Sequence, residues 1–119
     1  YTRKDLIDVA TSIMNDYAKR FSFIGKNIRL FKKILSKAEQ LPYPGEMKNL
    51  IRSAIAFSKP NDESDYLHRI YIALIPDGTN AIQNIRTLRE QGFTLREIEI
   101  LTGISRSTAA REMKGTHNE

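Results

Sequence analysis

The stretch over residues 93–114 constrains the fold of this 119-residue chain more than any other. Thr94 and Glu97 have the spacing of a capping box, in which each side chain accepts a hydrogen bond from the other residue's N–H at the start of a helix. Gly103 can adopt the left-handed conformation that ends such a helix, and Ser105 can cap the helix that follows. Two short helices joined by a tight turn are typical of a helix-turn-helix, whose second helix enters the DNA major groove.

An ordinary helical hairpin would show the same periodicity and is the alternative interpretation. The second helix, over residues 106–114, favours DNA because it carries three basic residues against one acid and few apolar residues. One of its faces must therefore stay in water. Glu99 departs from the motif, which usually has a small residue where its two helices close. Either the stem of Glu99 extends outward, or the two helices cross at a wider angle than usual.

The remaining sequence predicts a mainly helical protein. Apolar residues recur at helical spacing over residues 3–20, 27–40, 46–57 and 79–91. Residues 65–75 are ambiguous, because isoleucine and tyrosine suit a strand while an apolar side suits a buried helix. We favour a helix there, since the chain offers no second strand to pair with it. The prediction is an all-α fold, with a strand at residues 65–75 as the open alternative.

Two local boundaries can also be predicted. The first helix should bury a stripe that includes Ile13 and Phe21 and should stop around residues 22–25. The segment of residues 42–45 has the sequence PYPG, which is expected to exclude helix and to form a turn, so the third helix should begin at Glu46.

The chain divides into three parts around one polar segment. Residues 58–64 contain Pro60 and few apolar side chains, which indicates a linker. We predict a helical subdomain at residues 1–58, a linker with a buried connecting element at 59–78, and a helix-turn-helix subdomain at 79–119.

Positive charge is concentrated outside the helix-turn-helix. The net charge of the chain is +5, but residues 79–119 contribute only +1 of it. Residues 19–37 hold seven basic residues and no acid. A solvated face is the ordinary explanation for such a run, and a phosphate backbone is the alternative that would offset the repulsion.

Several kinds of chemistry are not indicated. The chain has no cysteine, two histidines and no glycine-rich phosphate loop, so we expect no catalysis, no metal and no cofactor. The acids at positions 62, 63 and 65 are better explained by a linker and a helix start than by metal binding. No apolar run approaches the roughly 20 residues that span a bilayer. The lack of cysteine fits a reducing compartment, and we expect a cytoplasmic location.

Three short segments resemble one family in a single order. They are Gly25-Lys26-Asn27 with Leu30-Phe31-Lys32-Lys33, then Leu41-Pro42 to Glu46 with Ile51-Arg52-Ser53-Ala54-Ile55, and finally Gly103-Ile104-Ser105-Arg106-Ser107-Thr108. This order is similar to the C-terminal part of plasmid replication initiators of the small colicin-type plasmids, which also act as primases. The segments are short, and residues 58–92 match nothing in the family. The resemblance implies a primase C-terminal motif followed by a helix-turn-helix, with the catalytic domain upstream. It also implies origin recognition and contact with host replication proteins.

The expected partner is double-stranded DNA at a replication origin. On the helix-turn-helix we expect base contacts or phosphate contacts from Thr94, Ser105, Arg106, Ser107, Thr108, Ala110, Arg111 and Lys114. A second, phosphate-contacting surface is expected from Lys26, Arg29, Lys33, Lys48 and Arg52.

Two other functions stay open at this stage. One is an accessory domain that holds single-stranded DNA and a nucleotide for a primase-polymerase, with Tyr43, Tyr66 and Tyr71 as candidates for base stacking, although core or turn packing is the simpler role for them. The other is a transcription regulator that dimerises through residues 3–40. We expect a monomer, with a homodimer as the alternative.

Overall fold

Helices form the described part of the chain, and no strand occurs there, so the all-α prediction is confirmed. The structure is a computed structural model that describes the backbone of residues 1–74 and 81–115 and the side chains of residues 1–74 and 85–111. The helices are α1 (Arg3–Ala18), α2 (Ser22–Lys26), α3 (Ile28–Lys37), α4 (Pro44–Ala56), α5 (Asp65–Leu74), α6 (Ala81–Glu90), α7 (Leu95–Thr102) and α8 (Arg106–Gly115). The ambiguous stretch at residues 65–75 is thus helical as far as Leu74, and the strand alternative is wrong.

Helix α1 begins at a capping box between Thr2 and Asp5. Its buried positions are Leu6, Ala10 and Met14, whereas Ile13 is only partly buried. Ile13 packs against the core, whereas Phe21 is 41% exposed, so the stripe predicted through Ile13 and Phe21 is wrong at its end. The reason is that the helix ends at Ala18, and the helical spacing no longer holds for residues beyond it.

The predicted end of the first helix is followed by another short helix. Helix α2 contains Ile24, which is fully buried and fixes this turn of chain against the core. Helix α3 then buries Leu30, Phe31, Ile34 and Leu35 on one side. The expectation that the first helix stops around residues 22–25 is wrong, because α1 already ends at Ala18 and residues 22–26 form a separate helix.

A single arginine side chain holds the C-terminal end of α3. The guanidinium of Arg3 donates to the carbonyl oxygens of Leu35, Ser36 and Ala38, and more weakly to that of Glu39. Helix ends leave such carbonyls without partners inside the helix. The contact therefore ends α3 and also joins its end to the start of α1.

The proline-rich turn after α3 differs from the prediction in one respect. Helix α4 begins at Pro44, not at Glu46, so the prediction that residues 42–45 exclude helix is wrong at its last two positions. Proline is tolerated in the first turn of a helix, where its missing N–H would have no partner inside the helix. Met47, Ile51 and Ala54 then form the buried face of α4.

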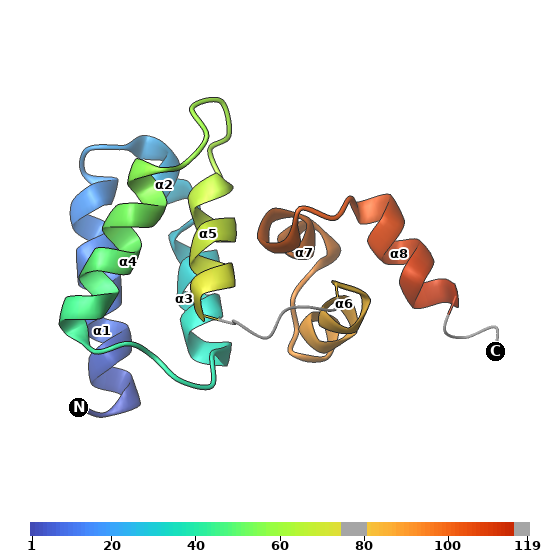
Figure 1. The fold of residues 1–119 in the computed structure, drawn as a ribbon, viewed down its shortest axis with the longest axis horizontal. Helices are drawn as coiled ribbons and strands as arrows, with labels where there is room; N and C mark the ends of the chain where they lie inside the picture. Colours follow the sequence, from blue (N-terminus) through green and yellow to red (C-terminus); the bar gives the residue numbers. More distant parts are fainter. Residues whose placement is uncertain (75–80, 116–119) are drawn as a thin grey trace.

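The helices form two groups that meet at α5 (Figure 1). In the first group α1 packs against α2, α3 and α4, and α4 packs against α5. In the second group α6, α7 and α8 pack against one another. Helix α5 also packs against α7, and its Tyr66, Leu67 and Ile70 are fully buried. The connecting element predicted within residues 59–78 therefore connects the two groups by packing, while its residues 75–78 lie outside the described ones.

The second group follows the predicted pattern. Ile85 and Leu88 of α6 are buried, and Gly92, with φ of 93°, follows that helix. The expected helix caps at Thr79 and Asn80, and the core position of Ile82, lie outside what the structure describes.

The start of α5 gives a testable dependence on pH. The Asp65 side chain is buried, accepts from the Lys59 N–H at 2.9 Å and pairs with Arg69 at 2.7 Å. Burial alone would raise the pKa of the Asp65 carboxyl, but the bonds from Arg69 and Lys59 outweigh it and lower the pKa below 3.8. A lowered folded-state pKa stabilises the protein above the unfolded-state pKa, and this stabilisation is lost as the pH falls through the folded-state value.

We expect Asp65→Asn to lower the free energy of unfolding by roughly 1 kcal/mol at pH 7, because Arg69 loses its charged partner. The difference between variant and wild type should shrink towards zero as the pH falls through the lowered folded-state pKa of Asp65, because the wild-type carboxyl then becomes protonated. Urea unfolding at pH 7 and at a series of lower pH values measures both effects. Asp8→Asn, at an exposed position of α1, is the control. A variant as stable as wild type at pH 7 would contradict the assigned role.

Candidate nucleic-acid interface

The first half of the helix-turn-helix is built as predicted. Thr94 Oγ1 accepts from the Glu97 N–H at 3.1 Å, and Glu97 Oε1 accepts from the Thr94 N–H at 2.8 Å. Gly103 ends α7 with φ of 78°, in the left-handed region where a side chain would be strained. Ile98 and Leu101 of α7 are fully buried. The capping box and the glycine turn are both confirmed.

Helix α8 presents most of its first turns to solvent. Ser105 Oγ accepts from the Thr108 N–H at 3.2 Å, so Ser105 caps this helix as predicted. Ala109 is fully buried and anchors α8 to its neighbours. The positions around it are exposed, namely Arg106, Ser107, Thr108, Ala110 and Arg111. The side chain of Lys114, also expected to contact DNA, lies outside the described residues.

Glu99 reaches across the turn to the start of α8. Its Oε2 accepts from the backbone N–H of Arg106 at 3.0 Å and from Arg106 Nε at 3.2 Å. The Glu99 side chain is 43% exposed, so its stem extends outward, the first of the two arrangements expected for this residue. A carboxylate at a helix N-terminus is stabilised by the partial positive charge there. Glu99 therefore occupies the first N–H of α8, one of the groups that could otherwise bind a phosphate.

The ammonium group of Lys33 is bound to other residues of the same chain. This ammonium donates to the carbonyl oxygen of Gly92 at 2.7 Å and to Glu97 Oε1 at 2.8 Å, and it lies 4.8 Å from the centre of the Phe93 ring. Burial alone would raise the pKa of the Glu97 carboxyl, but the bonds from Lys33 and Thr94 lower it below its ordinary value. This contact joins α3 to the turn before α7, so the structure does not leave Lys33 free for phosphate.

The other basic residues expected at the second surface fall on two sides of the bundle. Lys26 and Arg29 are exposed at α2 and α3, and the Lys26 ammonium lies 4.0 Å from a Glu63 carboxylate oxygen. Lys48 and Arg52 are exposed on α4, which Figure 1 shows on the side of the bundle away from α6, α7 and α8. The structure therefore does not bring all five predicted residues onto one face.

Lys33 shows which way the basic side of α3 faces. Residues four apart on a helix lie on the same side, so Arg29 and Lys37 flank Lys33 along α3. Because Lys33 contacts the turn before α7, this side of α3 is next to the helix-turn-helix. Arg29 and Lys37 are both exposed. We call Arg29 and Lys37 the α3 stripe.

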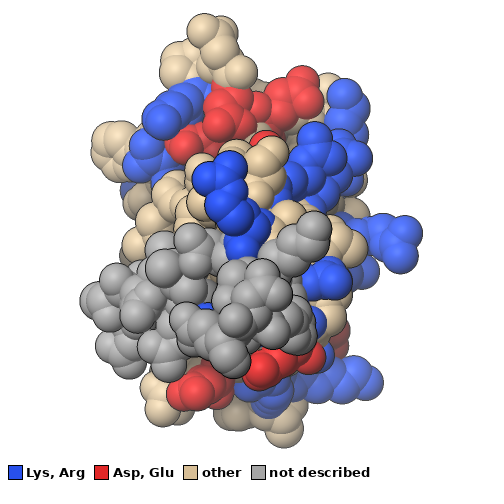
Figure 2. Space-filling model, turned by 90° about the vertical axis from the view of Figure 1, so that its right-hand side faces the viewer, with Lys and Arg blue, Asp and Glu red and all other residues tan. Residues whose placement is uncertain are grey.

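The face that carries the helix-turn-helix is rich in positive charge. Figure 2 shows Lys and Arg side chains along its right-hand edge and near its centre, with Asp and Glu in smaller groups above and below. A duplex approaching this face would meet basic side chains outside α8 as well as on it.

The tyrosines give little support to a surface for single-stranded bases. Tyr66 and Tyr71 are buried, and burial raises the pKa of the Tyr66 hydroxyl to about 12. Tyr43 is 66% exposed, and its ring lies 5.8 Å from that of Tyr1. Tyr66 and Tyr71 therefore pack in the core, as the simpler expectation has it, and only Tyr43 of the three is placed to stack on a base.

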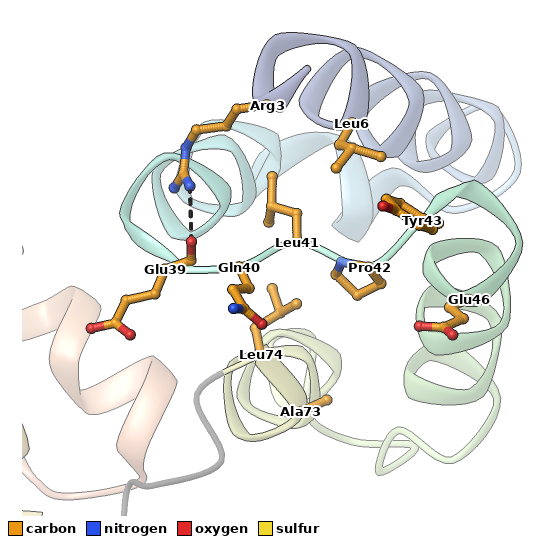
Figure 3. A pocket seen from close by; sticks show the side chains of 10 residues that line it. All are labelled: Arg3, Leu6, Glu39, Gln40, Leu41, Pro42, Tyr43, Glu46, Ala73 and Leu74. Atoms are coloured by element: carbon orange, nitrogen blue, oxygen red, sulfur yellow. Dashed lines mark hydrogen bonds between the residues drawn. The ribbon is translucent and has the colours of Figure 1, made fainter. Parts of the chain in front are cut away.

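A hollow away from the helix-turn-helix lies between the ends of α1, α4 and α5 (Figure 3). It has a volume of about 930 Å³, and its wall includes Arg3, Glu39, Tyr43 and Glu46. Arg3 is already bound to backbone carbonyls there, and the wall offers no paired base and nucleophile. Among the described residues there is also no group of three or more possible metal ligands, and no helix is long and apolar enough to cross a membrane.

Comparisons of the chain with protein-family models, with curated proteins and with solved structures gave no match in any of the three.

Two contacts of this interface could not be found from the sequence. The pairs Lys33–Glu97 and His68–Leu101 each join residues that are far apart in the chain, with His68 Nδ1 hydrogen-bonded to the Leu101 carbonyl oxygen. No local pattern predicts which helices meet. The Glu99–Arg106 pair did leave a signal, because an acid stands where this motif usually has a small residue.

Proposed function

We propose that this chain binds double-stranded DNA in a sequence-specific manner, with α8 in the major groove. The observation that carries the proposal is the exposure of Arg106, Ser107, Thr108, Ala110 and Arg111 around Ala109, which is the one buried residue among the described side chains of α8, those of residues 106–111. A helix that only completed a hairpin would be expected to bury more of its side chains. Here the cap, the turn and the buried anchor fix α8, and its polar side remains in solvent.

The exposed residues of α8 suit different parts of a duplex. Arg106 and Arg111 can each bind a guanine through two hydrogen bonds, and Ser107 and Ala110 are small enough to contact neighbouring base edges. Thr108 and Lys114 are assigned to the backbone, together with the N-terminal ends of α7 and α8 at Thr94 and Ser105. Since Glu99 already accepts from the first N–H of α8, phosphate at that end would bind through the remaining donors.

The resemblance to plasmid replication initiators supports a finer proposal, that the duplex is a replication origin. Selection of bound duplexes from a pool with a randomised central segment would test sequence specificity, whatever the base sequence of the site. We expect one enriched sequence, bound at least 1,000-fold more tightly than random duplex. Footprinting of the enriched site within candidate origin DNA would then test the origin. Equal binding of enriched and random duplexes would contradict the proposed function.

The α3 stripe is proposed to hold the phosphates that flank the site read by α8. We expect the double variant Arg29→Ala/Lys37→Ala to weaken binding to all duplex sequences alike. The slope of log affinity against log salt should become shallower by about 1.8, if each side chain neutralises one phosphate. Binding titrations at several salt concentrations, with the enriched and a random duplex, measure both effects.

The matched control is Lys48→Ala/Arg52→Ala, which removes the same two residue types from α4. Because α4 lies on the side of the bundle away from the helix-turn-helix, this variant should keep the wild-type salt slope. Equal losses in the two double variants would mean that general positive charge, and not the α3 stripe, provides the affinity.

A further inference from the structure

The contact between Glu99 and Arg106 uses a particular part of the guanidinium. Glu99 Oε2 accepts from Arg106 Nε, at 3.2 Å, and from the backbone N–H of the same residue, at 3.0 Å. The Arg106 side chain is nevertheless 64% exposed. One carboxylate oxygen therefore holds both the backbone and the inner edge of the guanidinium, while the group as a whole remains open to solvent.

We infer that Glu99 is a positioning residue that sets Arg106 to read one guanine. This inference rests on the proposed function and adds a determinant of its specificity. An arginine binds guanine O6 and N7 through two parallel N–H groups in a fixed fork. With Nε held by Glu99, the two terminal nitrogens remain for this bidentate contact, and the plane of the guanidinium is fixed before DNA arrives.

The surroundings of Arg106 explain why such a positioning residue is needed. Arg106 and Glu99 line a hollow of about 400 Å³ between the two groups of helices, together with Asn27, Glu63 and Ser64. The carboxylate of Glu63 is thus a second acid on this wall, and it lies 4.0 Å from the Lys26 ammonium. Without Glu99, Arg106 would be free to turn into the hollow towards Glu63.

The carboxylate of Glu99 also affects the affinity for random duplexes, which compete with the specific site. An acid at the start of α8 repels phosphates, so it lowers affinity for every duplex to a similar extent. The Arg106–guanine contact restores affinity only where the right base pair is present. Glu99 therefore increases the ratio of specific to random binding through the geometry of Arg106, while its repulsion of the backbone lowers the affinity for both kinds of duplex alike.

Replacement of single guanines by 7-deazaguanine in the enriched duplex tests this assignment, because the modified base lacks the N7 acceptor. The wild-type chain should lose roughly 5- to 100-fold in affinity at the guanine read by Arg106. Arg106→Ala identifies this guanine, since it should be insensitive to the change there. At this guanine, the loss of affinity caused by 7-deazaguanine should be less than half as large for Glu99→Ala as for the wild type, when the two losses are compared as logarithms. Glu99→Ala should also bind random duplex more tightly than the wild type does.

Glu90→Ala is the matched control, as it removes an exposed acid from α6 of the same group of helices. It should change general affinity but keep the full response to 7-deazaguanine. Glu99→Gln serves as the second variant if Glu99→Ala unfolds, because its amide oxygen can still accept from the Arg106 N–H. Its response should lie between those of the wild type and Arg106→Ala.

Three results would overturn the inference while leaving the proposed function intact. A folded Glu99→Ala or Glu99→Gln variant with the full wild-type response would show that Arg106 needs no positioning. A Glu99→Ala variant that binds the enriched site more tightly, with a larger response, would show that Glu99 withholds Arg106 from DNA. A wild-type chain that is specific but insensitive at every guanine would show that Arg106 reads none. Loss of the proposed function itself would appear earlier, as a failure of wild type to prefer the enriched duplex.

Discussion

Replacing Arg106 and Arg111 together with alanine is expected to remove about 2–6 kcal/mol of the free-energy difference between specific and random duplex. Each bidentate arginine–guanine contact contributes about 1–3 kcal/mol of discrimination, and contributions from separate base pairs are roughly additive. Both side chains are exposed on α8, so the fold should lose little stability. Competition between enriched and random duplexes at one salt concentration measures the difference.

The control for this variant is Arg20→Ala/Arg52→Ala, which removes two exposed arginines from the helical bundle. It should reduce general affinity at most and should leave the ratio between the two duplexes unchanged. If Arg106→Ala/Arg111→Ala lowered affinity for both duplexes equally, α8 would contact only phosphates, and the reader of the bases would have to lie elsewhere.

The helix-turn-helix could be predicted because its signals are local. Thr94 and Glu97 are three residues apart, and a single glycine at position 103 decides how α7 ends. The burial of Ile98 and Leu101 follows from the same short spacing. Each of these features depends on neighbours in the chain, so one sequence is sufficient to identify them.

The parts of the fold that were missed depend on contacts between distant segments. Arg3 lies more than 30 positions before the end of α3, and its guanidinium binds the carbonyl groups at that end. Helix α2 is short, and the burial of Ile24 contributes much of its stability. Pro44 is a different case, because the signal was local and was misread as excluding helix when it permits a helix start.

The residue types of the candidate site could be predicted from the sequence, but their arrangement in space could not. The exposed positions of α8 agree with those expected to face DNA as far as they are described, whereas Lys33 was expected at phosphate and is bound to Gly92 and Glu97. A lysine stripe has the same sequence whether its members contact solvent, phosphate or another helix. Only the packing of α3 beside the turn before α7 separates these cases.

That turn is also where the second large effect is expected. Phe93 is 1% exposed and lies between α6 and α7, with the Lys33 ammonium 4.8 Å from its ring centre. Phe93→Ala should lower the free energy of unfolding by about 3–5 kcal/mol, through lost burial and the cavity left behind. The attraction between the ammonium and the ring would be lost as well. Urea unfolding at neutral pH, followed by circular dichroism, measures the change.

Phe57→Ala is the matched control, because Phe57 is 72% exposed just after α4. It should change the free energy of unfolding by no more than about 0.5 kcal/mol. If Phe93→Ala cost less than about 1 kcal/mol, the turn before α7 would not be packed as described, and the contacts of Lys33 with Gly92 and Glu97 would be in doubt with it. The α3 stripe would then have no fixed position relative to α8, since the orientation assigned to the stripe rests on Lys33.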